Sequence, residues 1–324
     1  MVTEQKPLIS GIGPRTTAEE ALAGHDLRGK IAIVTGGHAG LGLETTRVLS
    51  NAGATLVVGS RDTGKAQIAV AKMRNVEVSQ LDLASPSSID RFADRFLGSN
   101  RALDLLINNA GIMAAPLTRD DRGYEMQFST NHLGHFQLTA RLWDALKKSG
   151  DARVVTLSSR GHMFSEVNFD DPNFNQRPYD KMAAYGQSKS ANSLFAVELD
   201  KRGQEHGIRS FAVHPGGILT DLVRHMTEEE LRAAGIYREN GVLKVPERFK
   251  TIEQGSATTI WCAVSPQLSG KGGVYCEDCD IAQLVPADHK PLNGVRPWAV
   301  DKRAAEALWS LSEKLTSISA GSIT

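Results

Sequence analysis

Short apolar runs rich in β-branched residues alternate with longer segments of helical period along most of the 324-residue chain. The runs are apolar on both faces, which is typical of parallel strands covered by helices on each side. The repeated order of strand, helix and strand predicts an α/β fold, a doubly wound parallel sheet of about seven strands with helices on both faces. The expected strands are IAIVTGG (31–37), ATLVVGS (54–60), VEVSQLD (76–82), LDLLINNAG (103–111), ARVVTLSS (152–159), IRSFAVHPGG (208–217) and GGVYCED (272–278).

The order of these segments also predicts the domain organisation. We expect a single domain over residues 30–324, preceded by an N-terminal arm, 1–29, that lies on the surface. Two stretches, 160–182 and 218–248, interrupt the alternation. Long loops beyond the carboxyl ends of strands are where such sheets bind small molecules, so we expect both stretches to be substrate loops. The segment 300–316 is expected to be a C-terminal helix.

Composition bears on which partners the protein binds and on the compartment in which it works. The 37 basic and 37 acidic residues cancel, so the net charge gives no reason to expect nucleic acid or an anionic membrane surface as a partner. No stretch is apolar for long enough to span a bilayer, and the N-terminus lacks the apolar core of a signal peptide. Three cysteines do not make a disulfide framework. We therefore expect a cytoplasmic protein without a membrane partner.

Cys276 and Cys279 form a C-x-x-C pair in the segment YCEDCD. One such pair without a second Cys or His pair is half of a zinc site, and the residues between the two cysteines are a poor start for the helix of a thioredoxin-like motif. The interpretation that we favour is two small residues near a strand end, and we expect no metal.

The segment TGGHAGLG (35–42) follows the first expected strand and opens a helix. In that context Gly36 permits the tight turn, Gly40 lets the backbone approach a pyrophosphate, and Gly42 allows the helix to pack closely on the sheet. The free N–H groups at the start of the helix attract phosphates. The alternative is a glycine-rich turn without a ligand. The spacing T-G-x-x-x-G-x-G differs from the G-x-G-x-x-G of most dinucleotide-binding domains.

Tyr185 and Lys189 in YGQSK lie four positions apart, on one face of an expected helix. A phenol has a pKa near 10, and a neighbouring cation should lower it toward the working pH of an acid–base catalyst. The alternative for this pair taken alone is an exposed contact on an amphipathic helix.

Together with the glycine loop, NNAG (108–111), Ser159 and YGQSK (185–189) make the chain resemble the short-chain dehydrogenase/reductase family from about Gly29 to about Asp280. The insert before Tyr185, the N-terminal arm and the phrase RVVTLSSRGH resemble its retinol-dehydrogenase and protochlorophyllide-reductase-like branch. The resemblance implies a Rossmann-type fold and a nicotinamide cofactor. It also implies homodimers or homotetramers, which the family commonly forms. Animal members of the branch are often anchored in membranes by an apolar N-terminal helix, and no such segment is present here.

The resemblance implies the catalytic set Asn131, Ser159, Tyr185 and Lys189. Tyr185 would be the general acid/base, Lys189 would tune it and bind ribose hydroxyls, and Asn131 would hold a water chain. The family pattern puts the hydroxyl that binds the substrate oxygen on Ser159 rather than Ser158, and strand alternation prevents the two from facing the same way. The neighbouring His132 and His135 lack a ligand partner at suitable spacing, and we interpret both as structural or surface residues.

The resemblance also implies which residues contact the cofactor. Among these contacts, Arg61 bears on the preference for NADP(H) or NAD(H). NAD-dependent enzymes usually carry an acidic residue after the second strand, whereas here Ser60 and Arg61 follow it, and a guanidinium suits a 2′-phosphate. NADP(H) is favoured, and NAD(H) stays open because Asp62 could pair with Arg61. The expected contacts are Thr35, Gly36, His38, Ala39, Gly40, Leu41, Gly42, Ser60, Arg61, Asp82, Leu83, Asn108, Ala110, Gly111, Tyr185, Lys189, Pro215, Gly216, Ile218 and Thr220.

The expected activity is NADP-dependent interconversion of a carbonyl compound and an alcohol. Two alternatives stay open: C=C reduction, epimerisation or dehydration on the same scaffold, and a non-catalytic cofactor-sensing protein. Large side chains in the two loops could line an apolar pocket for a bulky substrate, or they could pack the loops onto the body. These are Phe164, Phe169, Phe174, Tyr179, Met226 and Tyr237.

Overall fold

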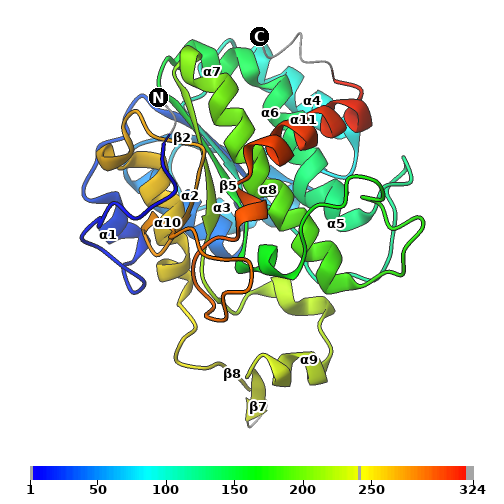
Figure 1. The fold of residues 1–324 in the computed structure, drawn as a ribbon. Helices are drawn as coiled ribbons and strands as arrows, with labels where there is room; N and C mark the ends of the chain where they lie inside the picture. Colours follow the sequence, from blue (N-terminus) through cyan, green and yellow to red (C-terminus); the bar gives the residue numbers. More distant parts are fainter. Residues whose placement is uncertain (1–2, 240–241, 319–324) are drawn as a thin grey trace.

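An eight-stranded sheet runs through the centre of the protein in the computed structural model, which describes residues 3–239 and 242–318 (Figure 1). The strand order is β10-β9-β6-β5-β4-β1-β2-β3, and all pairs are parallel except β10 with β9. Each of the seven expected runs forms a strand, so the doubly wound sheet is confirmed, with β10 added at one edge. The strands are β1 (Ile31–Thr35), β2 (Thr55–Ser60), β3 (Val76–Gln80), β4 (Leu105–Asn108), β5 (Ala152–Leu157), β6 (Ile208–His214), β9 (Val274–Glu277) and β10 (Asp280–Ile281).

Helices cover both faces of this sheet. On one face α1, α2 and α10 bury side chains such as Val48 and Ile260 in a core shared with Val34 of β1. On the other face α4, α6, α7 and α8 pack on the sheet, and α11 lies against α8. The α-helices are α1 (Ala18–Leu22), α2 (Gly40–Asn51), α3 (Thr63–Val70), α4 (Pro86–Gly98), α5 (Met126–Phe128), α6 (Gly134–Arg141), α7 (Trp143–Ser149), α8 (Lys181–Gly203), α9 (Glu228–Ala233), α10 (Ile252–Val264) and α11 (Lys302–Thr316).

Shorter helical turns occur where the chain changes direction. A single turn of π-helix, η1 (Ser129–Leu133), joins α5 to α6. The 3₁₀ turns are η2 (Arg160–Phe164), η3 (Gln204–His206), η4 (Asp221–His225), η5 (Pro266–Leu268) and η6 (Pro297–Ala299).

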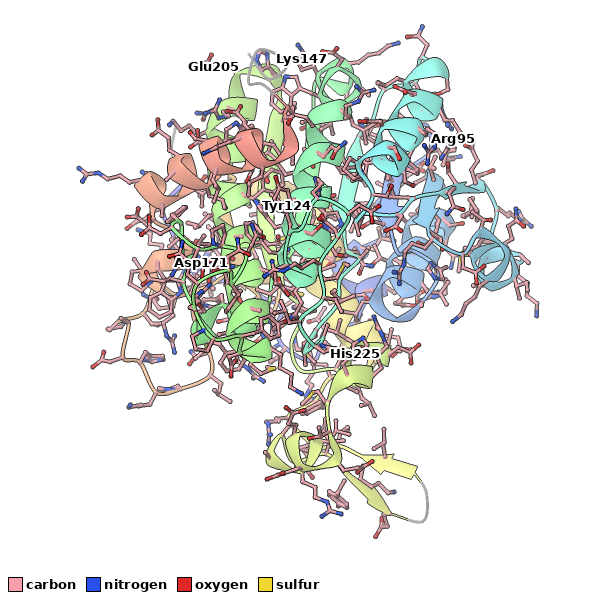
Figure 2. The ribbon with its side chains drawn as sticks, turned by 90° about the vertical axis from the view of Figure 1, so that its right-hand side faces the viewer. Arg95, Tyr124, Lys147, Asp171, Glu205 and His225 are labelled. Carbon is pink, nitrogen blue, oxygen red and sulfur yellow. The ribbon has the colours of Figure 1, made fainter. Side chains whose placement is uncertain are left out.

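The two interruptions of the strand–helix alternation differ in structure. Residues 160–182 begin with η2 and then run irregularly to α8. Residues 218–248 contain η4, α9 and the antiparallel pair β7 (Tyr237–Glu239) and β8 (Val242–Lys244), and this part projects from the body as a lobe (Figure 1). Figure 2 shows His225 near the base of the lobe and Lys147 and Glu205 at the opposite end of the molecule. An ion pair of 2.6 Å between Lys181 Nζ and Glu230 Oε1 ties the lobe to the start of α8.

The N-terminal arm lies against the edge of the sheet that ends in β10. The carboxylate of Asp280 accepts hydrogen bonds from the backbone N–H groups of Leu8, Ile9 and Ser10. The side chain of Gln5 donates to the carbonyl of Tyr275 at 2.8 Å. These contacts attach the arm to the last strands, and the division into an arm and one domain stays a prediction.

The cysteines lie on the side of the sheet that α10 covers. Cys262, Cys276 and Cys279 are free and buried, with Cys276 in β9 and Cys279 in the turn that follows. Within the described ranges no cluster of three or more His, Cys, Asp or Glu side chains could hold a metal ion. No helix of the described residues is long and apolar enough to cross a membrane.

Candidate active site

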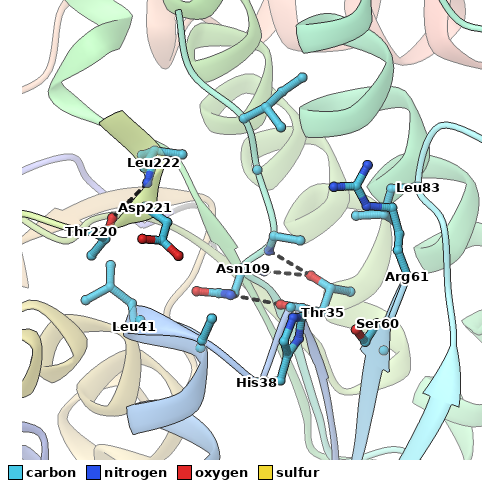
Figure 3. Close-up of a pocket in the computed structure, with 18 of the residues that line it drawn as sticks. Thr35, His38, Leu41, Ser60, Arg61, Leu83, Asn109, Thr220, Asp221 and Leu222 are labelled. Atoms are coloured by element: carbon cyan, nitrogen blue, oxygen red, sulfur yellow. Dashed lines mark hydrogen bonds between the residues drawn. The ribbon is translucent and has the colours of Figure 1, made fainter. Parts of the chain in front are cut away.

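A pocket of about 700 Å³ opens at the carboxyl ends of β1, β2 and β4 (Figure 3). This position is the topological switch point of the sheet, where the strand order reverses and where ligands of such folds bind. The predicted cofactor contacts that line it are Thr35, Gly36, His38, Ala39, Gly40, Leu41, Gly42, Ser60, Arg61, Asp82, Leu83, Ala110, Gly111 and Thr220. Lining residues that the sequence did not predict include Lys65, Asn109, Ile112, Thr130, Leu222 and Arg224.

The glycine turn forms one wall of the pocket and fits a phosphate group. Gly36 and Gly40 have positive φ angles of 65° and 50°, which favour glycine. A Cβ added at Gly42 would lie 2.4 Å from the carbonyl oxygen of Gly36, so only glycine fits there. The N-cap of α2 is Ala39, which makes no side-chain cap, and the N–H groups of the first turn are therefore available to an anion.

A buried network fixes the end of β1 beneath the pocket. Thr35 Oγ1 accepts the backbone N–H groups of Asn109 at 2.9 Å and Ala110 at 3.0 Å. The same hydroxyl lies 2.9 Å from His135 Nε2, while His135 Nδ1 lies 2.9 Å from the carbonyl oxygen of Asn131. Since a carbonyl only accepts, Nδ1 carries the proton and Thr35 donates to Nε2. Burial lowers the pKa of His135 to about 4, so the ring is neutral. His135 is therefore structural, as expected, and it joins the pocket floor to η1.

One end of the pocket is positively charged. Figure 3 shows Arg61 across the pocket from Thr220, Asp221 and Leu222. Asp62 does not neutralise Arg61, because its carboxylate caps α3 by accepting the Lys65 N–H at 2.9 Å. No ion pair or side-chain hydrogen bond of Arg61 occurs among the described residues.

His38 completes this end of the pocket. Burial lowers its pKa, and the charges of Lys65 and Arg61 act in the same direction, while Asp62 opposes them. His38 Nδ1 is buried and has no hydrogen-bond partner within the described ranges. An anion bound between these groups would meet two cations and one unpaired ring nitrogen.

Tyr185 and Lys189 lie one turn apart on α8, directly behind the pocket wall. Lys189 Nζ lies 5.6 Å from the centroid of the Tyr185 ring and donates to the carbonyl of Leu157 at 2.8 Å. A Cβ added at Gly111, a lining residue, would lie 3.6 Å from Lys189 Nζ. Because Gly111 has no side chain, only its backbone separates the Lys189 amino group from the pocket. Neither Tyr185 nor Lys189 lines the pocket itself.

Ser159 and Ser158 face different ways at the end of β5. Ser159 Oγ accepts the Gly161 N–H at 3.0 Å, and a Cβ added at Gly161 would lie 2.6 Å from Tyr185 Cε1 and 3.4 Å from Ser159 Oγ, so the hydroxyl lies beside the phenol ring and lowers its pKa. Ser158 instead donates to the carbonyl of Lys189 at 2.7 Å, inside the α8 packing. Of the two serines, Ser159 is therefore the one beside the phenol.

Asn131 sits in the π-turn η1, a kind of turn that is frequent at functional sites. Its Oδ1 accepts the Ile112 N–H at 2.9 Å, and its Nδ2 donates to Ser188 Oγ at 2.9 Å. A Cβ at Gly111 would lie 3.1 Å from the same Oδ1. Asn131 therefore connects the loop after β4 with α8, next to Lys189.

Burial dominates the protonation of the pair on α8. It raises the pKa of Tyr185 to about 12, against the hydrogen bond of Ser159 and the charge of Arg160, which both lower it. Burial also lowers the pKa of Lys189 to about 7. The sequence-based expectation of a net lowering of the phenol pKa is wrong for this structure, because only 4% of Tyr185 is exposed and desolvation exceeds the favourable contacts.

Besides Tyr185 and Lys189, four predicted cofactor contacts do not line the pocket. The Asn108 side chain is buried and donates to Thr139 Oγ1 and Thr156 Oγ1, and its neighbour Asn109 takes the lining position. The other three are Pro215, Gly216 and Ile218: a Cβ at Gly216 would meet the Lys250 side chain at 2.7 Å, and Ile218 packs against Gly255 of α10.

The large loop side chains do not line the pocket either. Phe174 is buried and packs edge-on against Tyr179 with ring centroids 5.1 Å apart. The Tyr179 hydroxyl donates to the carbonyl of Ala115 at 2.9 Å and accepts from Gln127 Nε2 at 3.0 Å, so these contacts hold residues 160–182 to the body. Phe164, Phe169 and Tyr237 are exposed. The question of an apolar substrate pocket therefore stays open.

Comparisons with known proteins agree with this geometry. The family model of the short chain dehydrogenases matches residues 30–231. A Streptomyces lividans protein named "Probable oxidoreductase" is 43% identical over 290 residues, covering 88% of this chain and 96% of the relative. Retinol dehydrogenase 12 of Mus musculus is 38% identical over 300 residues, covering 90% and 87% of the two chains. Among solved structures, an uncharacterized protein from Mycobacterium Paratuberculosis superposes with a TM-score of 0.72 at 33% identity, covering 94% of this chain and 98% of its own.

Proposed function

The chain belongs to the short-chain dehydrogenase/reductase family, in its retinol-dehydrogenase-like branch, and from this premise we propose that it is an NADP(H)-dependent enzyme that interconverts a carbonyl compound and an alcohol. The family implies an oxidoreductase with a nicotinamide cofactor and a small-molecule substrate. One observation supports the proposal: Lys189 lies directly behind Gly111 in the wall of a dinucleotide-sized pocket, one helical turn from Tyr185, and Tyr185 and Ser159 both lie against Gly161.

The residues present suit a dinucleotide. The free N–H groups at the start of α2 would hold the pyrophosphate, Asp82 and Ala110 would border the adenosine, and Lys189 would reach the ribose hydroxyls past Gly111. When bound, the nicotinamide supplies or accepts the hydride.

The proton is handled by α8 and β5. Ser159 would hydrogen-bond the substrate oxygen, and Tyr185 would protonate it in the direction of reduction. Because the pKa of Tyr185 is raised to about 12, the phenol carries its proton at neutral pH and is ready to donate. The phenolate left behind would be stabilised by the Ser159 hydroxyl and by the positive charges of Lys189 and Arg160.

The preference for NADP(H) rests on the positive end of the pocket. Arg61 and Lys65 line it without a carboxylate bound to Arg61, and the unpaired Nδ1 of His38 lies beside them. A 2′-phosphate would be attracted by both cations, whereas a 2′-hydroxyl would gain little from them.

A panel of bulky ketones, aldehydes and secondary alcohols, followed by NADPH absorbance with product identification, tests the activity. Stoichiometric loss of NADPH with an alcohol product is the expected result. A saturated product from an enone, or cofactor cycling without net oxidation, would instead indicate C=C reduction, epimerisation or dehydration. Absence of any nucleotide-dependent reaction would contradict the proposal.

A further inference from the structure

Arg160 immediately follows Ser159 and carries a charge that the mechanism uses only indirectly. Its side chain is half-buried, and within the described ranges its guanidinium makes neither a hydrogen bond nor an ion pair. Arginine side chains taken partly out of water are normally paired, because desolvation penalises a bare charge. A guanidinium in this position is therefore available to a ligand.

The backbone holds Arg160 beside the reacting groups. Its N–H donates to His214 Nδ1 at 3.1 Å, at the end of β6. The next residue, Gly161, packs on the catalytic phenol so closely that an added Cβ would lie 2.6 Å from Tyr185 Cε1. Arg160 is thus fixed between Ser159 and the residue that touches the Tyr185 ring.

The charges around Arg160 are engaged elsewhere. Lys250 Nζ pairs with Asp278 at 2.6 Å. Glu277 accepts the Gly294 N–H at 2.7 Å, and burial raises the pKa of its carboxyl while Arg160 opposes that rise. The pKa of His214 is lowered by burial and by the charges of Arg160 and Lys250, so the ring stays neutral. Among the described residues, no carboxylate forms an ion pair with Arg160.

A second polar group in this part of the molecule also has no partner among the described residues. The hydroxyl of Tyr275 on β9 is buried and has no hydrogen-bond partner among the described residues. Burial raises the pKa of the Tyr275 hydroxyl, and Tyr185 acts in the same direction, whereas the charge of Arg160 lowers it. The net rise means that the hydroxyl keeps its proton at neutral pH. The Arg160 guanidinium and the Tyr275 hydroxyl are thus two donors that have no acceptor among the described residues.

Building on the proposed function, we propose that the substrate carries a carboxylate near its reacting carbonyl and that Arg160 binds this carboxylate. A guanidinium can bind a carboxylate through two parallel hydrogen bonds, which would orient the carbonyl toward Ser159 and Tyr185. Arg160 is then a specificity-determining residue, and the substrate class is that of keto acids or hydroxy acids.

Matched pairs of substrates test this assignment. Aromatic keto acids with increasing spacing between ketone and carboxylate, beginning with benzoylformate, are each compared with their methyl esters by NADPH oxidation. At the spacing that fits, the acid is expected to exceed its ester in kcat/KM by about ten- to hundred-fold, the usual effect of a hydrogen bond to a charged group. Arg160→Gln should abolish this preference, and Arg160→Lys should keep part of it.

Controls separate this proposal from the proposed function. Arg160→Gln should leave NADPH affinity by fluorescence titration nearly unchanged, and it should lower turnover of the acid about ten-fold more than turnover of its ester, which loses only the effect of the Arg160 charge on Tyr185. Arg303→Gln on the exposed face of α11 should change neither quantity. Equal loss for acid and ester would show that Arg160 serves Tyr185 and not the substrate. Absence of acid preference at every spacing, together with no binding of benzoate to the protein–NADPH complex, would overturn the proposal while NADPH-dependent turnover of neutral ketones would still stand.

Discussion

At the scale of single residues, Arg61 and Lys65 after β2 give the most direct test of the preference for NADPH over NADH. Arg61→Ser should raise the KM for NADPH roughly ten-fold or more and leave the KM for NADH nearly unchanged, because only the 2′-phosphate needs the guanidinium. Steady-state kinetics with both nucleotides measures the ratio. Arg91→Ser, which removes an exposed charge from α4, is the matched control. An equal effect on the two nucleotides would rule out a 2′-phosphate contact for Arg61.

Lys65 extends the same argument. It lines the pocket four positions after Arg61, at the start of α3, and its charge acts on His38. Lys65→Met should weaken NADPH binding less than Arg61→Ser does, since a single ammonium does not offer the paired donors of a guanidinium. Fluorescence titration of the two variants gives the order, and the reverse order would assign the main contact to Lys65.

Sequence reasoning placed most single residues of the pocket, and its misses have physical reasons. Asn108 and Asn109 are neighbours in NNAG, and alternation along β4 turns the first into the core and the second to the pocket. Lys65 was missed because the face of α3 that carries its side chain is set by the turn at Asp62, the N-cap of α3, and the sequence alone does not show that this face borders the pocket. The pKa of Tyr185 was misjudged because spacing reveals a cation four residues away but not the depth of burial.

At the scale of elements, the turn between β1 and α2 depends on close backbone approach. Gly42→Ala would place a Cβ 2.4 Å from the Gly36 carbonyl oxygen and 2.5 Å from Asn109 Nδ2, so the turn must shift. We expect nucleotide affinity to fall by at least about ten-fold as the phosphate-binding N–H groups move. Gly98→Ala at the end of α4, where an added Cβ meets nothing within 4 Å, should bind nucleotide like the parent protein. Unchanged affinity in Gly42→Ala would show that the turn is not the phosphate site.

Elements were predictable where burial and period agree. The run ARVVTL is buried at every position of β5, and continuous apolar runs of this kind identify the central parallel strands. The edge strand β3, VEVSQ, has polar side chains at Glu77, Ser79 and Gln80 and is only partly buried. The pair β7 and β8 and the two-residue β10 were not predicted, because strands this short carry too few residues for a pattern. Ser85 is the N-cap of α4, and its side chain makes no cap hydrogen bond.

At the scale of the whole molecule, buried imidazoles link stability to pH. Burial lowers the pKa of His132 to about 3 and those of His135 and His162 to about 4. Between these values and the ordinary pKa near 6.5, the unfolded chain binds more protons than the native one, so stability falls as pH falls. Each ring should cost roughly 2 kcal/mol of unfolding free energy between pH 7 and pH 5. Urea unfolding at the two pH values measures the loss.

A variant isolates one of these rings. His132→Gln removes the imidazole that lies 2.7 Å from Ser312 Oγ of α11 and should show a smaller loss between pH 7 and pH 5 than the parent protein, whatever its stability at pH 7. Identical pH dependence in both proteins would mean that His132 is not buried as a neutral ring.

The whole architecture brings α8, the end of β5 and the switch point of the sheet together, and the claim that matters most is that Tyr185 supplies the proton there. The most direct measurement compares Tyr185→Phe with the parent protein, by NADPH fluorescence titration and by turnover of one active ketone. The account predicts nearly unchanged NADPH affinity and a turnover lower by about two orders of magnitude or more, as expected when an acid–base group is lost. Turnover retained within a few-fold in Tyr185→Phe would contradict it.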